Sequence, residues 1–362
     1  MNLLILGGTA FLGRAVAAAA LAQGHQVTCA ARGSAPVAPG ATLVRLDRDT
    51  DGLAAVSDHR WDAVVDVSRQ PGQVRAAVRE LDTAHRVFVS TGNVYADHAT
   101  PGTSEDAPLL PASTGDVLPP DADGLAYGSA KVACEEAVRE GRSTATVVRA
   151  GLIGGPGDVT GRVGYYPWRF AHPTGDDVLV PPDPTFPVAV IDVDDLAGWI
   201  VTAAQQRLDG TYDATGPTTD LATVLDAARR VAGSSAVARP VPAEVLADAG
   251  VEPFMGTPSL PLWIPDPDWR GFMTKTSRRA RRDGLVTRPL EHTLERTLAW
   301  EEGRDAPRAC GLTDAQERQL REVLDGTTGP LLPTWALAGY GGGVRHAVLA
   351  WKSGGRPDLA AP

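Results

Sequence analysis

The stretch that most constrains the fold is Gly7-Gly8-Thr9-Ala10-Phe11-Leu12-Gly13, which follows an apolar run at residues 3–6 and precedes an alanine-rich run. The apolar run predicts a buried strand, and the alanine-rich run predicts a helix. A glycine-rich turn between a strand and a helix leaves backbone N–H groups open to a pyrophosphate, because a larger side chain would block its approach. Glycine also occurs in such turns for backbone conformation alone. The order of strand, loop and helix nevertheless favours a dinucleotide site at the front of the chain.

The composition limits the class of protein. With 362 residues, 43% of them hydrophobic, the chain is long enough for one large α/β domain and a smaller one. A formal net charge of -10 disfavours a nucleic-acid partner, which usually needs clustered Lys and Arg. Cys29, Cys134 and Cys310 have neither metal nor disulfide spacing, so we expect no metal and a cytoplasmic location. We find no apolar run long enough to cross a bilayer and expect no membrane partner.

The loop resembles that of a known family. Gly7, Ala10 and Gly13 follow the GxxGxxG spacing of the extended short-chain dehydrogenase/reductases, the NAD-dependent epimerase/dehydratase family. Ala10 replaces the usual middle glycine, but its side chain is only a methyl group. The GGTxFLG form resembles a branch that includes atypical members. The resemblance implies an α/β fold, with a Rossmann-like doubly wound parallel sheet and a smaller C-terminal substrate-binding domain.

Two further motifs follow in the family's chain order. Residues 89–95 resemble the SS-x-x-VYG segment, with Thr91 at the position of the catalytic serine or threonine. Tyr127 and Lys131 match the YxxxK motif, and a spacing of four puts them on one helix face. A nearby ammonium favours phenolate, which can exchange a proton with an alcohol or carbonyl. The resemblance implies that Tyr127 transfers the proton, Lys131 tunes it and holds the nicotinamide ribose, and Thr91 polarises the substrate oxygen.

The cofactor is expected to be NADP, with NAD as the alternative. An acidic residue at the end of the second strand would select NAD, whereas this chain has Ala31 and then Arg32, which suits a 2′-phosphate. A solvated loop residue is the alternative role for Arg32. Asp47 matches the family's acidic residue that faces the adenine, with helix capping as the alternative. The full expected set is Gly7, Thr9, Ala10, Phe11, Leu12, Gly13, Arg32, Asp47, Arg48, Val67, Tyr127, Lys131 and Gly151, the last of these in the turn under the nicotinamide.

The substrate is expected to be a small molecule, and several residues are candidates to contact it. Asn93, Tyr165, Tyr166 and Trp168 are the expected pocket residues, with interdomain packing as the alternative for the aromatic ones. Further candidates are Trp263, Trp269, Phe272 and Met273. In the family, nucleotide-sugar enzymes hold the diphosphate with arginines where this chain has Val188 and about Pro265. We therefore expect a less charged substrate, unless Arg169 or Arg270 replaces those arginines.

The motifs admit more than one activity. Net oxidation or reduction of an alcohol or ketone is our main interpretation, and epimerisation of a sugar through a keto intermediate would use the same residues. Gly92-Asn93 stands where the family's dehydratases carry Asp-Glu, which disfavours dehydration. A non-catalytic NADP sensor is a third interpretation, but such relatives usually lack the Tyr-Lys pair. An RNA-binding protein is a fourth, because chloroplast stem-loop-binding proteins share the loop, but the acidic charge disfavours it.

The chain is expected to have three parts. Residues 1–215 form the NAD(P)-binding domain, with the loop 97–124 and the segment 158–186 contributing to the substrate pocket. Residues 216–325 alternate helical runs with proline-rich loops and form a small lid domain. Residues 326–362 form a tail. The oligomeric state stays open, with a homodimer as one assembly compatible with the resemblance.

Overall fold

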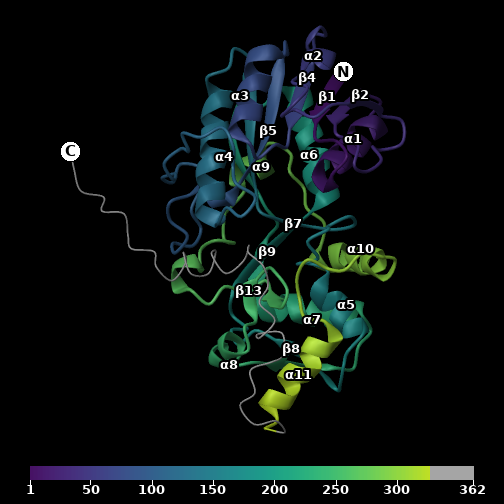
Figure 1. Cartoon of the computed structure of the whole chain (residues 1–362), viewed down its shortest axis with the longest axis vertical. Helices are drawn as coiled ribbons and strands as arrows, with labels where there is room; N and C mark the ends of the chain where they lie inside the picture. The colour runs from purple at the N-terminus through teal and green to yellow at the C-terminus, as the bar shows by residue number, and fades with distance from the viewer. Residues whose placement is uncertain (327–362) are drawn as a thin grey trace, which may run out of the picture.

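A computed structural model of the chain describes residues 1–326. The larger domain is built on a seven-stranded sheet in the order β10-β6-β5-β4-β1-β2-β3, with every neighbouring pair parallel (Figure 1). Its strands are β1 (Asn2–Leu6), β2 (Gln26–Ala31), β3 (Thr42–Arg45), β4 (Ala63–Asp66), β5 (His85–Thr91), β6 (Thr144–Ala150) and β10 (Gly210–Ala214). The strand order reverses between β1 and β4, and ligands of such sheets bind at the carboxyl ends of strands at this switch point.

Helices cover both faces of the sheet, because each helix buries one apolar stripe against the strands. On one face lie α1 (Phe11–Ala22) and α6 (Val193–Gln206). On the other lie α2 (Ala54–Ser57), α3 (Pro71–Glu80) and α4 (Gly124–Arg139). The predicted doubly wound parallel sheet is therefore confirmed.

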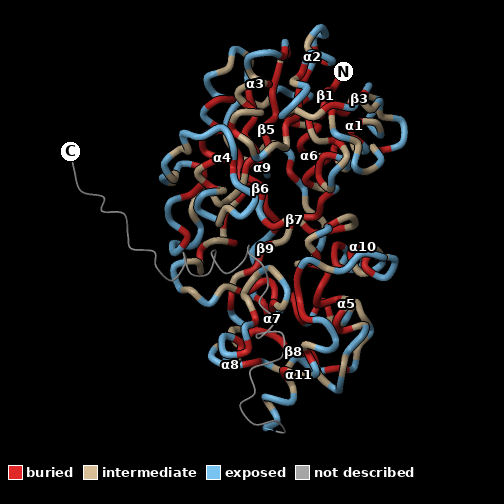
Figure 2. The backbone as a smooth tube through the Cα atoms, in the orientation of Figure 1, coloured by how far each residue is buried: buried red, intermediate tan, exposed pale blue. Residues whose placement is uncertain are grey.

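A second, smaller domain has its own hydrophobic core, seen as a separate buried interior in Figure 2. This core combines residues 221–320 with residues 152–189, which the predicted division had placed in the first part of the chain. Its elements include β7 (Leu152–Gly154), α5 (Tyr165–Ala171), β8 (Asp177–Val180), β9 (Pro187–Asp192), β11 (Thr218–Asp220), α7 (Leu221–Val231), β12 (Val237–Pro240), α8 (Ala243–Asp248), β13 (Glu252–Phe254), β14 (Ser259–Pro261), α10 (Leu290–Glu302) and α11 (Asp314–Leu324). Between them, η2 (Pro267–Trp269) is a short 3₁₀ helix, and α9 (Arg278–Arg282) lies beside the large sheet (Figure 1).

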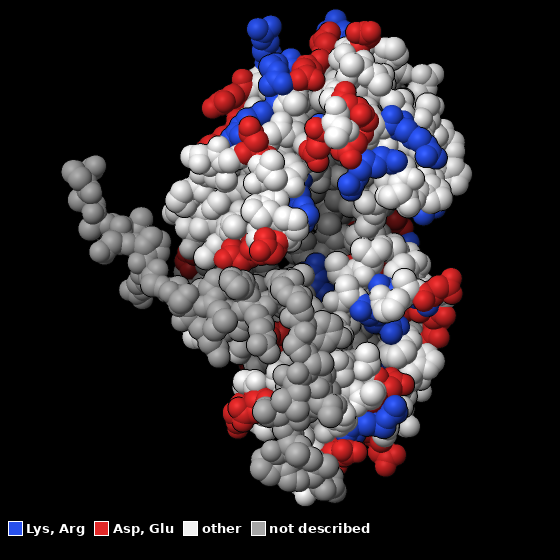
Figure 3. Space-filling model, in the orientation of Figure 1, with Lys and Arg blue, Asp and Glu red and all other residues white. Residues whose placement is uncertain are grey.

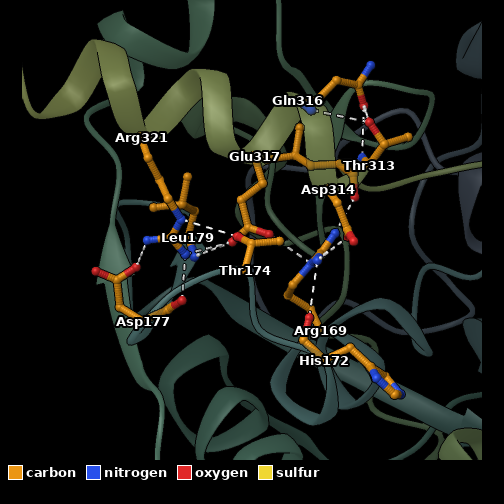
Figure 4. Close-up of polar contacts among 11 residues, drawn as sticks. Arg169, His172, Thr174, Asp177, Leu179, Thr313, Asp314, Gln316, Glu317 and Arg321 are labelled. Atoms are coloured by element: carbon orange, nitrogen blue, oxygen red, sulfur yellow. Dashed lines mark hydrogen bonds and ion pairs between the residues drawn. The ribbon is translucent and has the colours of Figure 1, made fainter. Parts of the chain in front are cut away.

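Helix α11 is joined to the rest of the second domain by buried charges (Figure 4). The Arg169 guanidinium on α5 pairs with Asp314 at 2.7 Å and with Glu317 at 2.9 Å, and both Arg169 and Glu317 are fully buried. Arg321 pairs with Glu317 and also with Asp177 of β8. Arg169 is thus fully used in holding the domain together, and the alternative role of contacting a substrate diphosphate is not open to it. The expected tail lies almost entirely outside the described residues.

No helix within residues 1–326 combines the length and the apolar character needed to cross a membrane. All three cysteines are free and buried, as expected for small hydrophobic core residues.

Candidate active site

The loop after β1 has the geometry of an anion-binding turn. Gly7 has φ +102°, and a Cβ there would lie 2.6 Å from Cγ2 of Val67, so only glycine fits. Ala10 precedes α1 as its N-cap, yet it makes no side-chain cap, and the first turn of α1 carries no acidic residue. Phe11 packs beneath Gly157, whose ideal Cβ position lies 3.4 Å from its ring. The first N–H groups of α1 are thus open to a phosphate, which fits a dinucleotide.

Two arginines lie at the neighbouring ends of β2 and β3. Arg32 is exposed. Arg45 pairs in register with Ala31, and its guanidinium carbon lies 3.4 Å from the ideal Cβ position of Gly33. Within the described chain, neither arginine forms an ion pair. Arg45 was missed from the sequence, and the signal that could have found it is that the third strand pairs beside the second and ends in a cation.

The other expected cofactor residues differ in their surroundings. The Asp47 carboxylate accepts a hydrogen bond from the Asp49 N–H at 3.0 Å, so it closes a turn and caps no helix. Arg48 forms a bidentate ion pair with Asp66 at 2.9 and 3.1 Å and also bonds to the Gln73 carbonyl. Both side chains of this pair are more than nine-tenths buried. Arg48 is therefore assigned to holding the ends of β4 and α3, because both of its terminal nitrogens are already bonded there.

The end of β5 meets the start of α4 closely. The Thr91 hydroxyl donates to Asn93 Oδ1 at 3.0 Å and accepts from the Asn93 N–H at 3.3 Å. A Cβ on Gly128 would collide with the Asn93 carbonyl, so glycine is required for this approach. Thr91 and Asn93 are thereby held against the first turns of the helix that carries Tyr127.

Tyr127 and Lys131 share one face of α4. The sequence predicts a helix over residues 129–140. Helix α4 begins five residues earlier, at Gly124, because the Asp123 side chain caps it by accepting the Ala126 N–H at 2.8 Å. Lys131 is buried, and its Nζ donates to the carbonyls of Ser68 at 2.7 Å and Val89 at 2.6 Å. An ammonium has three donors, so one remains for a further partner. The Tyr127 phenol is partly buried and makes no hydrogen bond to any residue of the described chain.

A buried polar network supports α4 from below. Arg149, in β6, bonds to both carboxylate oxygens of Glu135 at 2.8 and 3.0 Å, and the Ser90 hydroxyl donates to Glu135 at 2.5 Å. Burial opposes the ionisation of Glu135, but Arg149 outweighs it and holds the pKa of Glu135 below its usual value. This network joins α4 to β5 and β6, so it fixes the position of Tyr127 and Lys131 relative to the carboxyl ends of these strands. Its members were not foreseen as site residues, because their pairing is visible only in the fold.

The network continues to β10. The Tyr95 hydroxyl donates to Asp213 at 2.7 Å, and burial raises the pKa of Asp213 to about 7. Burial also raises the pKa of Tyr95 well above its usual value. Tyr95 is therefore a structural hydrogen-bond donor beside the site and not a second proton-transfer group.

The expected aromatic pocket residues need a correction. Tyr165 and Tyr166 are 1% and 0% exposed and belong to the core of the second domain, so they cannot line an open pocket. Trp168 stacks on the Arg308 guanidinium at 3.6 Å, on the side of α5 toward Glu301. Trp263 and Met273 are likewise buried in that core. The partly exposed candidates are Trp269 and Phe272.

Comparisons with known proteins agree with this fold. The model of the NAD dependent epimerase/dehydratase family matches residues 3–214. The solved UDP-glucose 4-epimerase of Thermotoga maritima is similar, with 18% identity and a TM-score of 0.60 over 84% of this chain and 99% of that one. UDP-glucuronic acid 4-epimerase of Bacillus cereus, in complex with NAD, is 14% identical, with a TM-score of 0.60 over 84% of this chain and 99% of that one.

Bordetella bronchiseptica WbmG, in complex with NAD and UDP, gives 17% identity and a TM-score of 0.62 over 83% of this chain and 94% of that one. None of the curated proteins matches the chain. At these identities the solved structures establish the shared fold. The family model covers more than half of the sequence, and the chain therefore belongs to the NAD-dependent epimerase/dehydratase family.

Proposed function

We propose that this protein is an enzyme that uses NAD(P) to take a hydride from the carbinol carbon of a small alcohol or to give one to the carbonyl carbon of a small ketone. The observation that carries the proposal is the convergence of Thr91, Tyr127 and Lys131 where β5 meets α4, beside the switch point that holds the glycine-rich loop. The open N-terminus of α1 and the free donor of Lys131 fit the pyrophosphate and ribose of such a cofactor. When bound, the nicotinamide supplies the acceptor or donor of hydride.

The chain's own groups would move the proton. In the oxidation direction, the Tyr127 phenolate takes the proton of the substrate hydroxyl, while the Thr91 hydroxyl turns from Asn93 and donates to the same oxygen. The Lys131 ammonium is held by two carbonyls and has no carboxylate partner among residues 1–326, so its charge is free to favour the phenolate. In the reduction direction, the same phenol returns the proton.

Epimerisation through a transient ketone is the second candidate, and the family match and the similar 4-epimerases favour it. Both candidates are tested by mixing the protein with cofactor and a panel of hydroxy and keto compounds. Stoichiometric change in nicotinamide absorbance indicates net oxidoreduction. Conversion of a hydroxyl's configuration without net absorbance change, with a deuterium on that carbon retained, indicates epimerisation.

We propose further that the substrate is not a UDP-sugar, despite those similar proteins. Val188 is fully buried, Pro265 is an exposed loop residue, and Arg270 is already paired with Asp183 at 2.6 Å. A diphosphate would therefore lack the paired cations that it needs. Saturable micromolar binding of UDP would overturn this part of the proposal.

We expect NADPH to bind more tightly than NADH, because Arg32 and Arg45, which form no ion pair in the described part of the chain, offer two guanidinium groups at the ribose end of the site. One charge-assisted contact contributes roughly 1.5–3 kcal/mol, or roughly tenfold or more in affinity. Arg32→Ala and Arg45→Ala should each weaken NADPH binding by that factor and leave NADH binding unchanged in fluorescence titrations. Arg142→Ala, which removes an exposed charge from the opposite edge of the sheet, is the control. Tighter binding of NADH, or an unchanged ratio in both variants, would contradict this preference.

A further inference from the structure

Arg162 lies in the loop between β7 and α5, and its position is fixed by local hydrogen bonds. Asp158 accepts from the Thr160 N–H at 2.9 Å and from its hydroxyl at 2.7 Å. The Thr160 oxygen in turn accepts from Nε of Arg162 at 3.3 Å. The loop therefore presents the guanidinium in one orientation, with Nε used and the two terminal nitrogens left over.

The terminal nitrogens of Arg162 have no partner among residues 1–326, although the side chain is partly buried. Other buried arginines of the second domain pair with carboxylates, as Arg169 does with Glu317 and Arg308 with Glu301. Asp158 is near enough to favour the charged form of Arg162, but it forms no ion pair with it among residues 1–326. A partly buried cation without an ion-pair partner is costly unless a ligand supplies one. The four free N–H donors suit a planar or tetrahedral oxyanion.

A row of aromatic rings runs from Arg162 to the start of α4. The Arg162 guanidinium lies 5.0 Å from the centre of the Phe254 ring, which lies 6.1 Å from that of Phe272, which lies 5.3 Å from that of Trp269. Trp269 reaches within 3.8 Å of the ideal Cβ position of Gly124, the first residue of α4. This aromatic row, Phe254, Phe272 and Trp269, is partly exposed.

Two details mark the row as more than packing. Phe254 has φ +65°, a left-handed conformation that bulky residues rarely adopt and that gathers at ligand sites. His98 stacks on Trp269 at 4.5 Å, and both of its buried ring nitrogens lack a hydrogen-bond partner among residues 1–326. Figure 3 shows the surface hollowed between the two domains, with lysine or arginine atoms visible in the hollow.

Arg162 also lies within electrostatic range of the reacting group. Burial lowers the pKa of Arg162, and Asp158, Cys310 and Tyr127 are near enough to oppose that shift. A group bound by Arg162 would thus lie within electrostatic range of the Tyr127 phenol.

We propose that Arg162 binds an oxyanion, a carboxylate or a phosphate, on the substrate of the Tyr127 site, and that the aromatic row packs against a flat or apolar part of that substrate. That the bound molecule is a substrate rests on the proposed function, but anion binding by Arg162 does not depend on turnover. The substrate would then carry one anionic group. This agrees with Val188 and Pro265 standing where the family's nucleotide-sugar enzymes carry the arginines that hold a diphosphate.

The test uses the full chain saturated with its cofactor and measures binding by calorimetry. Benzoate and phenyl phosphate are the two anionic probes, and benzamide is the neutral one of similar shape. We expect at least one anionic probe to bind saturably and benzamide to bind roughly tenfold or more weakly. Arg162→Gln should lower the affinity for that anion by roughly 10- to 150-fold, the range for charged hydrogen bonds, and leave benzamide unchanged. The anion affinity of Arg162→Lys should lie between those of the parent protein and Arg162→Gln, because lysine keeps the charge but loses the two parallel donors of the guanidinium.

The control is Arg318→Gln, which removes an exposed arginine of the same domain that forms no ion pair within residues 1–326, and it should change nothing. Binding of benzoate alone identifies a carboxylate, and binding of phenyl phosphate alone identifies a phosphate. Equal anion binding by Arg162→Gln and the parent protein overturns the proposal, as does a loss of cofactor affinity alone. If Arg162→Gln does not fold, the wild-type preference between anion and benzamide and the Arg162→Lys affinity decide the matter. Anion binding through Arg162 without any hydride transfer would remove the proposed function and leave this site standing.

Discussion

Tyr127→Phe should produce a folded protein that binds its cofactor normally but turns over its substrate roughly 10²- to 10⁴-fold more slowly, the range for losing a general acid or base. The phenol makes no hydrogen bond within the described part of the chain, so removing its oxygen breaks no resting contact and changes little volume. The measurement is kcat on the substrate identified from the panel, together with cofactor titration and an unfolding curve. Loss of stability should be within a few tenths of a kcal/mol, as for most changes away from buried features.

The substitutions at Thr91 provide a matched pair for that experiment. Thr91→Ser keeps the hydroxyl that donates to the substrate oxygen, so turnover should be largely retained. Thr91→Val keeps the shape and loses the donor, so turnover should fall. Near-normal turnover of Tyr127→Phe would show that another group transfers the proton, and it would remove the role assigned to Tyr127.

Local patterns were sufficient to predict the fold and the order of the motifs. The apolar runs that became β1, β4 and β5 are short, continuous and bounded by turn residues, which is typical of strands buried on both faces. The glycine-rich loop could be located because its residues serve the backbone, as Gly7 does with φ +102°. The start of α4 was misplaced because the proline- and glycine-rich loop hid the capping Asp123.

The predicted surroundings of the site were less accurate, because they depend on partners far away in the sequence. The sequence predicts that Tyr165 and Tyr166 line the substrate pocket, but in the fold α5 directs both side chains into the core of the second domain. Arg48 and Arg162 look alike as isolated loop arginines, yet Arg48 forms an ion pair with Asp66, whereas Arg162 forms no ion pair within the described residues. Only the fold separates an arginine that holds structure from one that is available to a ligand.

The ion pair of Arg169 and Glu317 illustrates an arginine that holds structure, and its loss should have the largest effect on stability. Arg169 bonds to the Leu312 carbonyl at 2.7 Å in addition to its two carboxylates, so it links α5 to the start of α11. Helix α5 begins three residues after Arg162, and the same link therefore supports the loop that presents Arg162. Removing the guanidinium leaves the Glu317 carboxylate fully buried, with Arg321 as its one remaining charged partner among residues 1–326.

We expect Arg169→Met to lower the free energy of unfolding by about 3–5 kcal/mol, the cost of leaving one partner of a buried pair uncompensated. Urea unfolding, followed by circular dichroism, measures the change. Arg230→Met is the matched control, because Arg230 and Glu291 form an exposed pair at 3.0 Å, with 57% and 47% of their side chains accessible, and its loss should cost less than about 1 kcal/mol. Adding Glu317→Leu to Arg169→Met should recover much of the lost stability, since no charge then stays buried without its partner. If Arg169→Met costs no more than Arg230→Met, the buried charges do not hold α11 in place, and the apolar contacts of α11, such as that of the fully buried Leu320, must do so instead.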